Sequence, residues 1–356
     1  MARVSDRSQS IAERIAAASE AGTPLAITGS GSKAFYGRAP QGEALDVTGH
    51  RGIVNYDPTE LVLTARGGTP LAEIETALDA EGQMLAFEPP RYGGGGTLGG
   101  AVAAGLSGPR RPFTGAVRDM MLGTRVANGR GEIMRFGGEV MKNVAGYDVS
   151  RLMAGSLGTL GVILEISLKV LPRPVAAHTV VLETPMGDVF RHSEDWLRRG
   201  MPLSATAHDG ERLYVRLSGA RSAVEDATRA LGGERIDDAP GFWRSVRDHT
   251  HDFFTSEGPP LWRLALPPGA PLPALDGALF SEWAGKQLWL RSAADAESIR
   301  RETARLGGHA TLFRGGDRSG EVFHPLEAVT LRLHRELKRA FDPAGVLNPG
   351  RLYPNL

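Results

Sequence analysis

Apolar positions near the start of the chain recur with the period of an amphipathic helix. Ile11 and Ile15 fall on one helical face, and Ser10 followed by Glu13 has the form of a capping box. Gly22 is expected to end this helix. The pattern therefore predicts a first helix between the capping box and Gly22.

Short strands and helices alternate along the next part of the chain. Residues 24–28 form an apolar run that passes into a Gly/Ser-rich turn, and residues 60–65 repeat the strand pattern. Thr69 followed by Pro70 predicts a helix N-cap with proline at the first helical position. This alternation indicates a domain of α+β or α/β type.

Further elements are expected before the prolines Pro172 and Pro174, which mark a domain boundary. The pattern predicts strands at 121–127 and 131–136 joined by an Asn-Gly hairpin turn, a short helix at 147–154 and a strand at 162–171.

Beyond residue 178 the glycine clusters disappear, and strands alternate with charged helices, as in an antiparallel sheet with helices on one face. The strands include 213–217 and 287–291, and the helices include 221–231, 293–306 and a last one near 325–341. The expected parts are a first domain, a second domain and a C-terminal segment that returns toward the first, at residues 1–174, 175–320 and 321–356.

Composition narrows the classes of protein that fit. The 41 basic and 41 acidic side chains give zero formal net charge, so there is no basic excess for binding nucleic acid. The absence of cysteine excludes disulfides, thiolate metal sites, iron–sulfur ligation and a cysteinyl link to a cofactor. Residues 1–9 lack the apolar core of a signal peptide, and no run approaches the roughly 18 apolar residues of a spanning helix. We therefore expect a soluble protein.

The most unusual segment is 93–108, in which six of the first eight residues are glycine. Glycine loses more backbone entropy on folding than any other residue, so the run indicates close backbone approach or successive turns with positive φ. Exposed N–H groups in that geometry suit phosphate oxygens. A flexible linker is the alternative, but linkers are polar and this run continues into an apolar segment.

A second turn, Gly29–Ala34, follows a predicted strand and fits the pattern G-x-G-x-x-A of dinucleotide-binding folds. The long helix which that fold requires does not follow, because residues 35–40 contain a glycine and a proline. The hydroxyls and N–H groups of the turn, with Lys33 beside them, suit a diphosphate, and a purely structural turn is the alternative. His249 and His251 are interpreted as a polar surface segment rather than a metal site, and no metal is expected.

The order and spacing of these segments resemble the FAD-binding PCMH-type flavoproteins of the vanillyl-alcohol oxidase family. The resemblance runs from residues 24–37 through 93–108, 141–148 and 155–163 to 341–350. It implies an α+β fold, in which an FAD-binding domain of two subdomains is followed by an α+β cap domain with an antiparallel sheet over the reactive face of the flavin.

The resemblance also implies which residues contact FAD. The 29–34 turn is expected to hold the diphosphate, the 94–100 segment to follow the diphosphate and isoalloxazine, and the 158–163 segment to meet the adenosine half. The expected cofactor-binding residues are Gly29, Ser30, Gly31, Ser32, Lys33, Ala34, Gly94, Gly95, Gly96, Thr97, Leu98, Gly99, Gly100, Ser107, Gly108, Gly158, Thr159, Gly161, Val162 and Ile163.

Two departures from the family pattern change what is expected. Ser32 stands where many relatives carry a histidine that links covalently to the flavin, so noncovalent FAD is expected. The H-x-G-D-G-N-x-H metal motif that relatives acting alone on D-2-hydroxy acids carry in the cap is absent, which argues against independent catalysis of that step.

Within this family the chain is similar to flavin subunits of bacterial glycolate oxidase. This implies hydride transfer from C2 of glycolate to the flavin, in a cytoplasmic complex with a paralogous FAD subunit and an Fe–S subunit, reaching the inner membrane only through that complex. Another chain must carry the cluster, because this one has no cysteine. Two alternatives stay open: an FAD electron-relay or scaffold subunit without turnover, and a stand-alone flavin dehydrogenase of another alcohol.

No catalytic base can be named from the sequence. Arg247, Arg263 and Arg351 are candidates to anchor a substrate carboxylate, since arginine offers a bidentate fork, and an ordinary surface ion pair is the alternative for each. Asn348 is a candidate to reach the flavin edge. The Asn348 and Arg351 hypotheses fail together if the 341–356 segment lies far from the flavin site.

Overall fold

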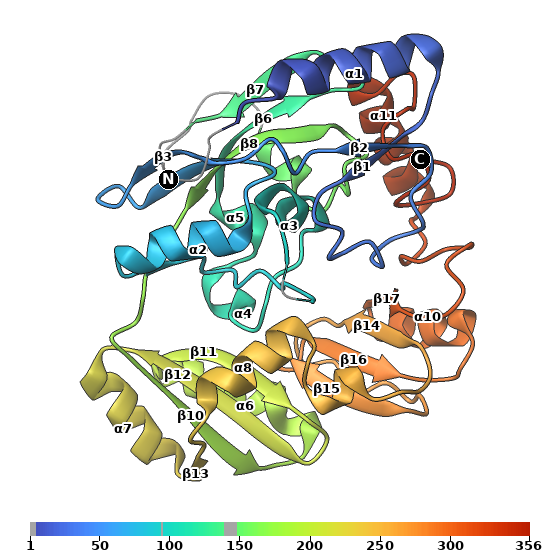
Figure 1. Ribbon diagram of the computed structural model, residues 1–356. Coiled ribbons are helices and arrows are strands. Elements are labelled where there is room, and N and C mark those ends of the chain that lie inside the picture. The colour runs from blue at the N-terminus through green and yellow to red at the C-terminus, as the bar shows by residue number, and fades with distance from the viewer. Residues whose placement is uncertain (1–4, 94, 139–147) are drawn as a thin grey trace. The chain divides into compact units, whose positions relative to one another are not determined.

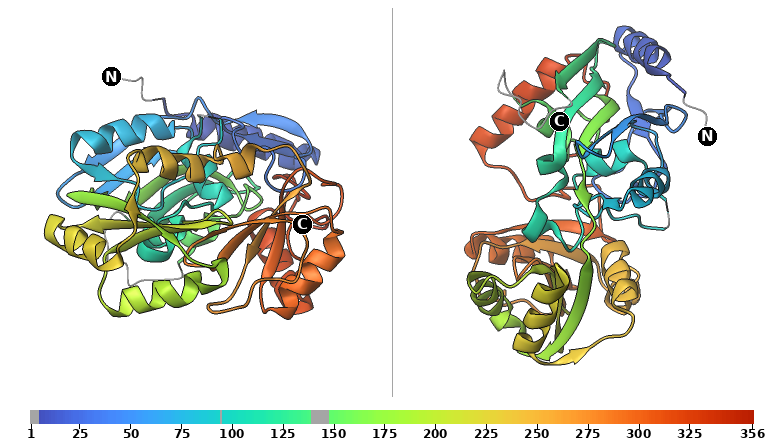
Figure 2. Two further views of the ribbon diagram at one scale, coloured as in Figure 1. Left: turned by 90° about the horizontal axis from the view of Figure 1, so that it is seen from below. Right: turned by 90° about the vertical axis from the view of Figure 1, so that its left-hand side faces the viewer.

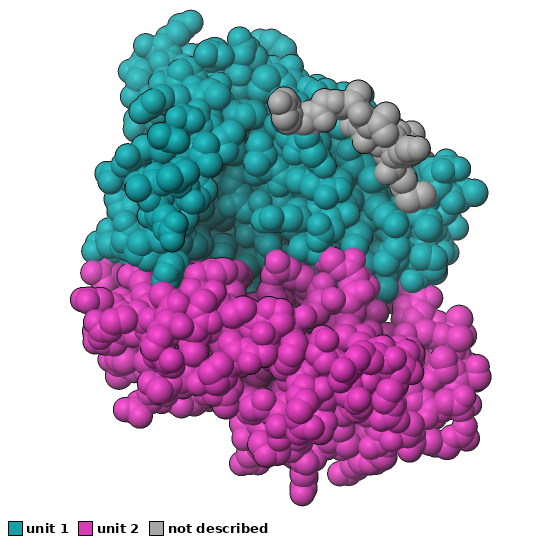
Figure 3. Space-filling model, turned by 180° about the vertical axis from the view of Figure 1, so that it is seen from behind, with its two compact units in different colours: residues 1–106, 116–172, 318–356 teal, residues 107–115, 173–317 magenta. Residues whose placement is uncertain are grey.

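The computed structural model describes residues 5–93, 95–138 and 148–356 (Figure 1). The chain divides into two compact units, coloured separately in Figure 3. Unit 1 comprises residues 1–106, 116–172 and 318–356, and unit 2 comprises residues 107–115 and 173–317. The domain boundaries expected from the sequence stay a prediction. Residues 107–115 belong to unit 2, although they fall within the range expected for the first domain.

Unit 1 is built on an antiparallel sheet with the strand order β3-β4-β8-β6-β7. Its strands are β3 (Ile53–Asp57), β4 (Val62–Arg66), β6 (Met121–Ala127), β7 (Ile133–Gly137) and β8 (Val162–Lys169). The hairpin predicted from the Asn-Gly turn is confirmed, because β6 and β7 pair with Val126 opposite Met134. Strand β8 lies at the centre of the sheet, and its apolar side chains are buried.

The glycine-rich turn at residues 29–34 lies between two strands that pair in parallel. Strands β1 (Leu25–Thr28) and β2 (Glu43–Asp46) pair in parallel, and a second small pair joins β5 (Gln83–Met84) to β9 (Leu171–Pro172). Helix α1 (Ser8–Ala21) packs Ile11 and Ile15 against Leu25 and Leu347 in one buried cluster. The core that positions β1 therefore combines residues from both ends of the sequence.

The start of α1 differs from the prediction. The helix begins at Ser8 rather than after Ser10, whose hydroxyl donates to the carbonyl of Arg7, so the expected capping box is wrong. The carboxylate of Asp6 accepts a hydrogen bond from the N–H of Ser8 at 2.9 Å and supplies the polar contact at the helix start. The end of the helix at Gly22 is confirmed, with φ of 64°.

The remaining helices of unit 1 are α2 (Leu71–Ala80), α3 (Leu98–Ala104), α5 (Val117–Met120), the 3-10 turn η1 (Ser150–Met153) and α11 (Ala328–Phe341). The Thr69 cap predicted for α2 is wrong, because the Thr69 hydroxyl accepts from the N–H of Gly52 and the helix begins after Pro70. Of the helix predicted at 147–154, the structure has only η1, and Tyr147 lies outside the described residues.

Unit 2 contains an antiparallel sheet with the strand order β13-β10-β12-β11-β15-β16-β14-β17. The strands are β10 (Ala176–Glu183), β11 (Leu203–His208), β12 (Arg212–Gly219), β13 (Glu234–Arg235), β14 (Leu261–Ala265), β15 (Ala278–Glu282), β16 (Gln287–Arg291) and β17 (His309–Arg314). The strands predicted at 213–217 and 287–291 are confirmed.

Helices lie on both faces of this sheet, not on one face as predicted (Figure 2). They are α4 (Arg111–Thr114), η2 (Met186–Asp188), α6 (Val189–Arg198), α7 (Arg221–Leu231), α8 (Ala239–Asp248), α9 (Asp252–Thr255) and α10 (Ala296–Arg305). Adjacent residues of β10 show the two faces: His178 hydrogen-bonds to Thr228 of α7, and Thr179 accepts from Trp243 of α8. Charge patterns along helices cannot reveal which face each one covers. In the described part of the chain, no helix is long and apolar enough to cross a membrane.

Candidate cofactor-binding site

A groove of about 120 Å³ in unit 1 brings the 29–34 turn together with segments that are distant in the sequence. The lining residues are Ile27, Thr28, the 29–34 turn, Pro40, Thr97, Gly100, Ala103, Ala104, Leu157, Asn348 and Arg351. None of these lining residues is acidic. The groove is therefore suited to an extended anionic ligand rather than a cation.

The 29–34 turn forms one wall of the groove. The N–H of Ala34 donates to the carbonyl of Gly31 at 2.9 Å, which fixes the turn, and the hydroxyls of Ser30 and Ser32 lie 3.4 Å apart. Gly31 has φ of +75°, and no atom lies within 4 Å of the place where its Cβ would be. The turn thus presents its backbone to open space, which a side chain at Gly31 would fill.

The 93–100 glycines serve two different purposes. Gly99 packs against the chain itself: its N–H donates to Gly67 at 2.7 Å, and a Cβ there would lie 2.9 Å from the same carbonyl oxygen. A Cβ on Gly96 would lie 2.9 Å from Leu71, whereas Gly100 lines the groove. Gly94 lies outside the described residues. Internal packing therefore explains the glycines at 96 and 99, and the contacts of the 94–100 segment with FAD that the family resemblance implies stay predictions.

Thr97 lies between the 29–34 turn and the start of α3. Its hydroxyl caps α3 by accepting from the N–H of Gly100 at 3.2 Å. A Cβ on Gly29 would lie 2.8 Å from that same hydroxyl oxygen. The absence of a side chain at Gly29 thus allows the first turn to approach the start of α3.

Asn348 connects three segments at the edge of the groove. Its side-chain oxygen accepts from the N–H of Ile27 at 2.8 Å, and its side-chain nitrogen donates to the carbonyl of Leu157 at 2.6 Å. The residue is 4% exposed. The C-terminal segment therefore lies beside the 29–34 turn. Asn348 connects the strand before that turn to the glycine-rich turn at residues 155–161.

Arg351 places a positive charge behind the 29–34 turn. Its guanidinium donates to the carbonyl of Ala34 at 3.0 Å and to that of Arg38, and Arg318 donates to the neighbouring carbonyl of Gly37 at 2.6 Å. Burial, with a smaller contribution from Arg318, lowers the pKa of Arg351 to about 10. The guanidinium is still charged at neutral pH, so it attracts an anion in the groove.

The glycine-rich turn at residues 155–161 packs on the end of α3. The N–H groups of Gly155 and Leu157 donate to the carbonyls of Val102 and Ala103 at 3.0 and 2.9 Å. A Cβ on Gly158 would lie 2.7 Å from the side-chain nitrogen of Asn348. Leu157 from this turn lines the groove. The residues predicted to meet adenosine, Gly158, Thr159, Gly161, Val162 and Ile163, do not line it, and their contacts with FAD stay predictions.

Other predicted site residues belong to unit 2. Ser107 and Gly108 lie there, and the Gly108 carbonyl accepts from the indole of Trp283 at 3.1 Å. The fork of Arg247 is engaged by Asp248, with contacts of 2.9 and 2.7 Å, and Arg263 lies in β14. Among the described residues, no group of three or more His, Cys, Asp or Glu side chains could hold a metal ion.

Sequence reasoning missed several residues that build the groove. Pro40, Ala103 and Leu157 line it, and Arg318 supports the adjacent backbone. Ala103 had a usable signal, because it falls in the small-residue run after the glycines. Leu157 had one as well, because it lies in the glycine-rich turn at residues 155–161. Pro40 and Arg318 carry no local motif, and only the three-dimensional arrangement brings them to the groove.

Comparisons with known proteins give the family. Residues 5–137 match the family described as "FAD binding domain", and residues 315–352 match "FAD linked oxidases, C-terminal domain". The glycolate oxidase subunit GlcE of Escherichia coli K12 is 49% identical over 356 residues, which is 100% of both chains. The chain belongs to the GlcE family of FAD-linked oxidases. Members of the GlcE family are FAD-dependent oxidoreductases, so the predicted cofactor and enzyme class are confirmed.

More distant relatives agree with this placement in the GlcE family. Glycolate oxidase subunit GlcD of Bacillus subtilis is 32% identical over 165 residues, which cover 46% of this chain and 35% of GlcD. A crystal structure of p-cresol methylhydroxylase with bound substrate superimposes with a TM-score of 0.70 at 16% identity, over 98% of this chain and 87% of that one. The predicted α+β, PCMH-type fold is confirmed.

Proposed function

We propose that the chain is an FAD-binding subunit of a complex that oxidises glycolate or a similar 2-hydroxy acid. The full-length relation to a protein named glycolate oxidase subunit GlcE supports the substrate class and the multi-subunit organisation. The observation that carries the proposal in this chain is the groove at the 29–34 turn, where an open Gly/Ser turn, Lys33 and Arg351 meet without a lining carboxylate.

The residues of the groove fit the diphosphate of FAD. The N–H groups of the 29–34 turn and the hydroxyls of Ser30 and Ser32 would donate to its oxygens, while Lys33 and Arg351 would balance its charge. Gly100 and Ala104 leave room for a flat ligand to follow the wall of α3. Ser32 and the absence of cysteine support noncovalent binding.

The contacts with the remainder of FAD rest on the family resemblance. The 94–100 segment would follow the isoalloxazine, Ser107 and Gly108 would lie near the ring, and the 158–163 segment would meet adenosine. When bound, FAD supplies the acceptor for a hydride from C2 of the substrate. The partners we propose are a paralogous FAD subunit and an Fe–S subunit, with the complex in the cytoplasm and reaching the inner membrane only through its partners.

One alternative is an FAD subunit that relays electrons or supports its partners without turning over substrate. The contacts of the candidate catalytic residues favour it. Asp248 occupies the fork of Arg247, while Asn348 and Arg351 bond to the backbone of unit 1. Of the four candidates only Arg263 lacks such a commitment among the hydrogen bonds described.

Anaerobic reduction distinguishes these functions. The chain, purified alone with FAD, is treated with glycolate, and the flavin absorbance is followed before and after adding the two partner subunits. Bleaching of the isolated chain supports catalysis here and contradicts the relay alternative. Bleaching only after the partners are added contradicts a stand-alone dehydrogenase. A chain that binds no FAD under any condition contradicts both.

Replacing Asn348 tests the proposed place of FAD. Asn348→Ala removes the hydrogen bonds to Ile27 and Leu157, which hold two walls of the groove together. Because buried polar groups lose their partners, FAD binding should weaken by about tenfold or more. Titration of the apoprotein by flavin fluorescence measures this, and Asn355→Ala, at an exposed position nearby, is the matched control. Equal affinity in the two variants would contradict the placement.

A further inference from the structure

Two residues of the groove at the 29–34 turn, which we call the cofactor groove, have a backbone conformation that is rare for L-amino acids. Among the described residues that line it, Leu157 has φ of 49° and Asn348 has φ of 43°, both in the left-handed region. Asparagine tolerates this region, whereas a leucine there is an outlier. Such conformations persist only where the surrounding structure enforces them, and they cluster at ligand-binding sites.

The two left-handed residues are joined to each other. The side-chain nitrogen of Asn348 donates to the carbonyl of Leu157 at 2.6 Å. A Cβ on Gly158 would lie 2.7 Å from the same nitrogen, so the backbone after Leu157 also lies close to this side chain. The position of each left-handed residue therefore depends on that of the other.

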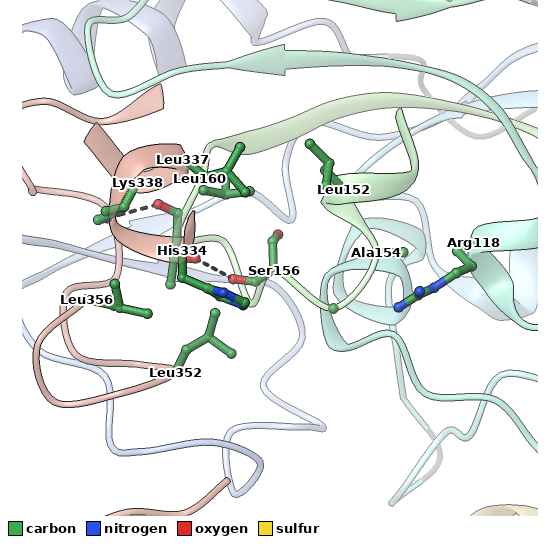
Figure 4. A pocket seen from close by; sticks show the side chains of 12 residues that line it. Arg118, Leu152, Ala154, Ser156, Leu160, His334, Leu337, Lys338, Leu352 and Leu356 are labelled. Atoms are coloured by element: carbon green, nitrogen blue, oxygen red, sulfur yellow. Dashed lines mark hydrogen bonds between the residues drawn. The ribbon is translucent and has the colours of Figure 1, made fainter. Parts of the chain in front are cut away.

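Lys338 contacts the backbone beside both of them. It belongs to α11, lines a cavity of about 250 Å³ next to that helix (Figure 4) and does not line the cofactor groove. Its ammonium donates to the carbonyl of Thr159 at 2.9 Å, two residues after Leu157. It also donates to the carbonyl of Leu347 at 2.7 Å, directly before Asn348. One side chain thus joins the two segments that contain the left-handed residues.

Asp342 holds the other side of the same backbone. Its carboxylate is buried, accepts from Lys338 at 2.7 Å and accepts from the N–H groups of Leu347 and Val346 at 2.7 and 3.2 Å. Leu347 is therefore held at both its N–H and its carbonyl, immediately before Asn348. Hydrogen bonds to charged groups are stronger than those between neutral groups, so this pair is suited to enforcing an unfavourable φ.

We propose that Lys338, together with Asp342, is a positioning residue for FAD, which holds Leu157 and Asn348 in the left-handed conformations that shape the cofactor groove. This inference rests on the proposed function, because it takes the groove to bind FAD. A binding site whose groups are already ordered loses less entropy when its ligand binds. The Lys338–Asp342 pair therefore raises the affinity for FAD without touching it.

The alternative is that Lys338 and Asp342 only attach α11 to unit 1. A substitution at Lys338 would then lower the stability of the protein, but the folded chain would bind FAD as tightly as before. The two roles therefore differ in the affinity for FAD, measured where the substituted chain is folded.

Lys338→Arg separates these roles. Arginine keeps a positive charge beside Asp342, but its planar guanidinium cannot direct N–H groups at the same three acceptors as the compact ammonium. The affinity for FAD, from flavin fluorescence titration of the apoprotein, should fall by about tenfold. Arg339→Lys, at the next and exposed position, is the matched control and should leave the affinity unchanged. Leu78→Ala removes a fully buried leucine of α2 that does not line the groove, and so controls for lost stability.

A double-mutant cycle tests whether Lys338 acts through Asn348. If it does, the chain with both Lys338→Arg and Asn348→Ala should bind FAD at least about threefold more tightly than the product of the two single losses predicts. Losses that multiply fully would overturn the proposal. A loss for Lys338→Arg no larger than that for Leu78→Ala would also overturn it.

Hydrogen exchange of the unsubstituted chain keeps the test independent of the folding of any variant. The N–H groups of Val346 and Leu347 bond to Asp342, and neither residue lines the cofactor groove. FAD should slow their exchange by about tenfold or more, and by more than it slows that of Leu78 in α2, because an occupied groove holds Asn348 in place. Exchange at both that slows no more than at Leu78 would overturn the proposal.

These outcomes separate the inference from the proposed function. If the unsubstituted chain binds no FAD, the proposed function fails and takes this inference with it. If the unsubstituted chain binds FAD and Lys338→Arg binds it equally tightly, the proposed function stands and this inference fails.

Discussion

Helices α1 and α11 both contain 14 residues and both belong to unit 1, yet they are attached to it in different ways. Helix α1 buries five residues, and three of them, Ile11, Ile15 and Ala18, belong to the cluster around Leu25. Helix α11 buries only Lys338. Buried apolar side chains hold α1 in place, whereas the Lys338–Asp342 ion pair, its backbone hydrogen bonds and the partly buried Phe341 attach α11.

This difference shows why an amphipathic pattern does not by itself indicate burial. The sequence of α11 has the apolar spacing of a core-facing helix, and α1 has a similar spacing. In α11 Val329 and Leu333 are exposed, and the buried position is held by Lys338, which pairs with the carboxylate of Asp342.

The largest effect is expected from the ion pair that attaches α11. Lys338→Met leaves the carboxylate of Asp342, which is 1% exposed, without its cation and should destabilise the protein by about 3–5 kcal/mol. Urea unfolding measures the change. Arg339→Met, at the next and exposed position, is the control and should change stability by less than about 0.5 kcal/mol. A loss below about 1 kcal/mol for Lys338→Met would show that α11 is attached in another way.

The next effect compares equivalent truncations in the two helices. Ile15→Ala in α1 removes a fully buried side chain and should cost about 2–4 kcal/mol of unfolding free energy. Leu333→Ala in α11 removes a half-exposed side chain and should cost less than about 0.5 kcal/mol. Thermal unfolding of both variants checks the difference. Equal losses in unfolding free energy would mean that Leu333 belongs to a core in the isolated chain.

The smallest effect concerns pH and applies to α1. The hydrogen bond from Ser8 lowers the pKa of Asp6 to about 2, below its unfolded value near 3.8. Ionised Asp6 therefore stabilises α1 above about pH 4, and this contribution disappears as pH falls toward 2. Because the side chain is 49% exposed, we expect less than about 1 kcal/mol.

Urea titrations at pH 5 and pH 3 of the protein and of Asp6→Asn measure this contribution. Asparagine can still accept from Ser8, so the variant isolates the effect of the charge. The difference in stability between the two proteins should shrink at the lower pH. A constant difference would show that Asp6 acts at the start of α1 through geometry alone.

Much of the fold could be predicted from local patterns. The β6–β7 hairpin follows from its Asn-Gly turn, and α7 spans the predicted residues 221–231. Two helix caps were predicted wrongly, because the groups at Ser10 and Thr69 hydrogen-bond elsewhere. At α1 a different local group, the carboxylate of Asp6, contacts the start of the helix, whereas at α2 a tertiary contact with Gly52 engages Thr69.

Only part of the candidate site could be predicted from the sequence. The Gly29–Ala34 turn carries a local motif, because phosphate binding requires small residues in succession. No local motif indicates the role of Asn348, because this role depends on hydrogen bonds to Ile27 and Leu157, which are distant in the sequence. Gly99 shows that glycine content alone does not reveal what lies beside the backbone: the backbone of Gly67 lies there, and the expected contact of Gly99 with FAD stays a prediction.

The bond between Asn348 and Ile27 also affects when the groove can form. The two residues are 321 positions apart, and all of the larger stretch of unit 2 lies between them. Because a chain is synthesised from its N-terminus, β1 and its turn leave the ribosome long before the residue that connects them to Leu157. Completion of the groove thus becomes one of the last events of folding, and a chain interrupted before residue 348 cannot form the complete groove.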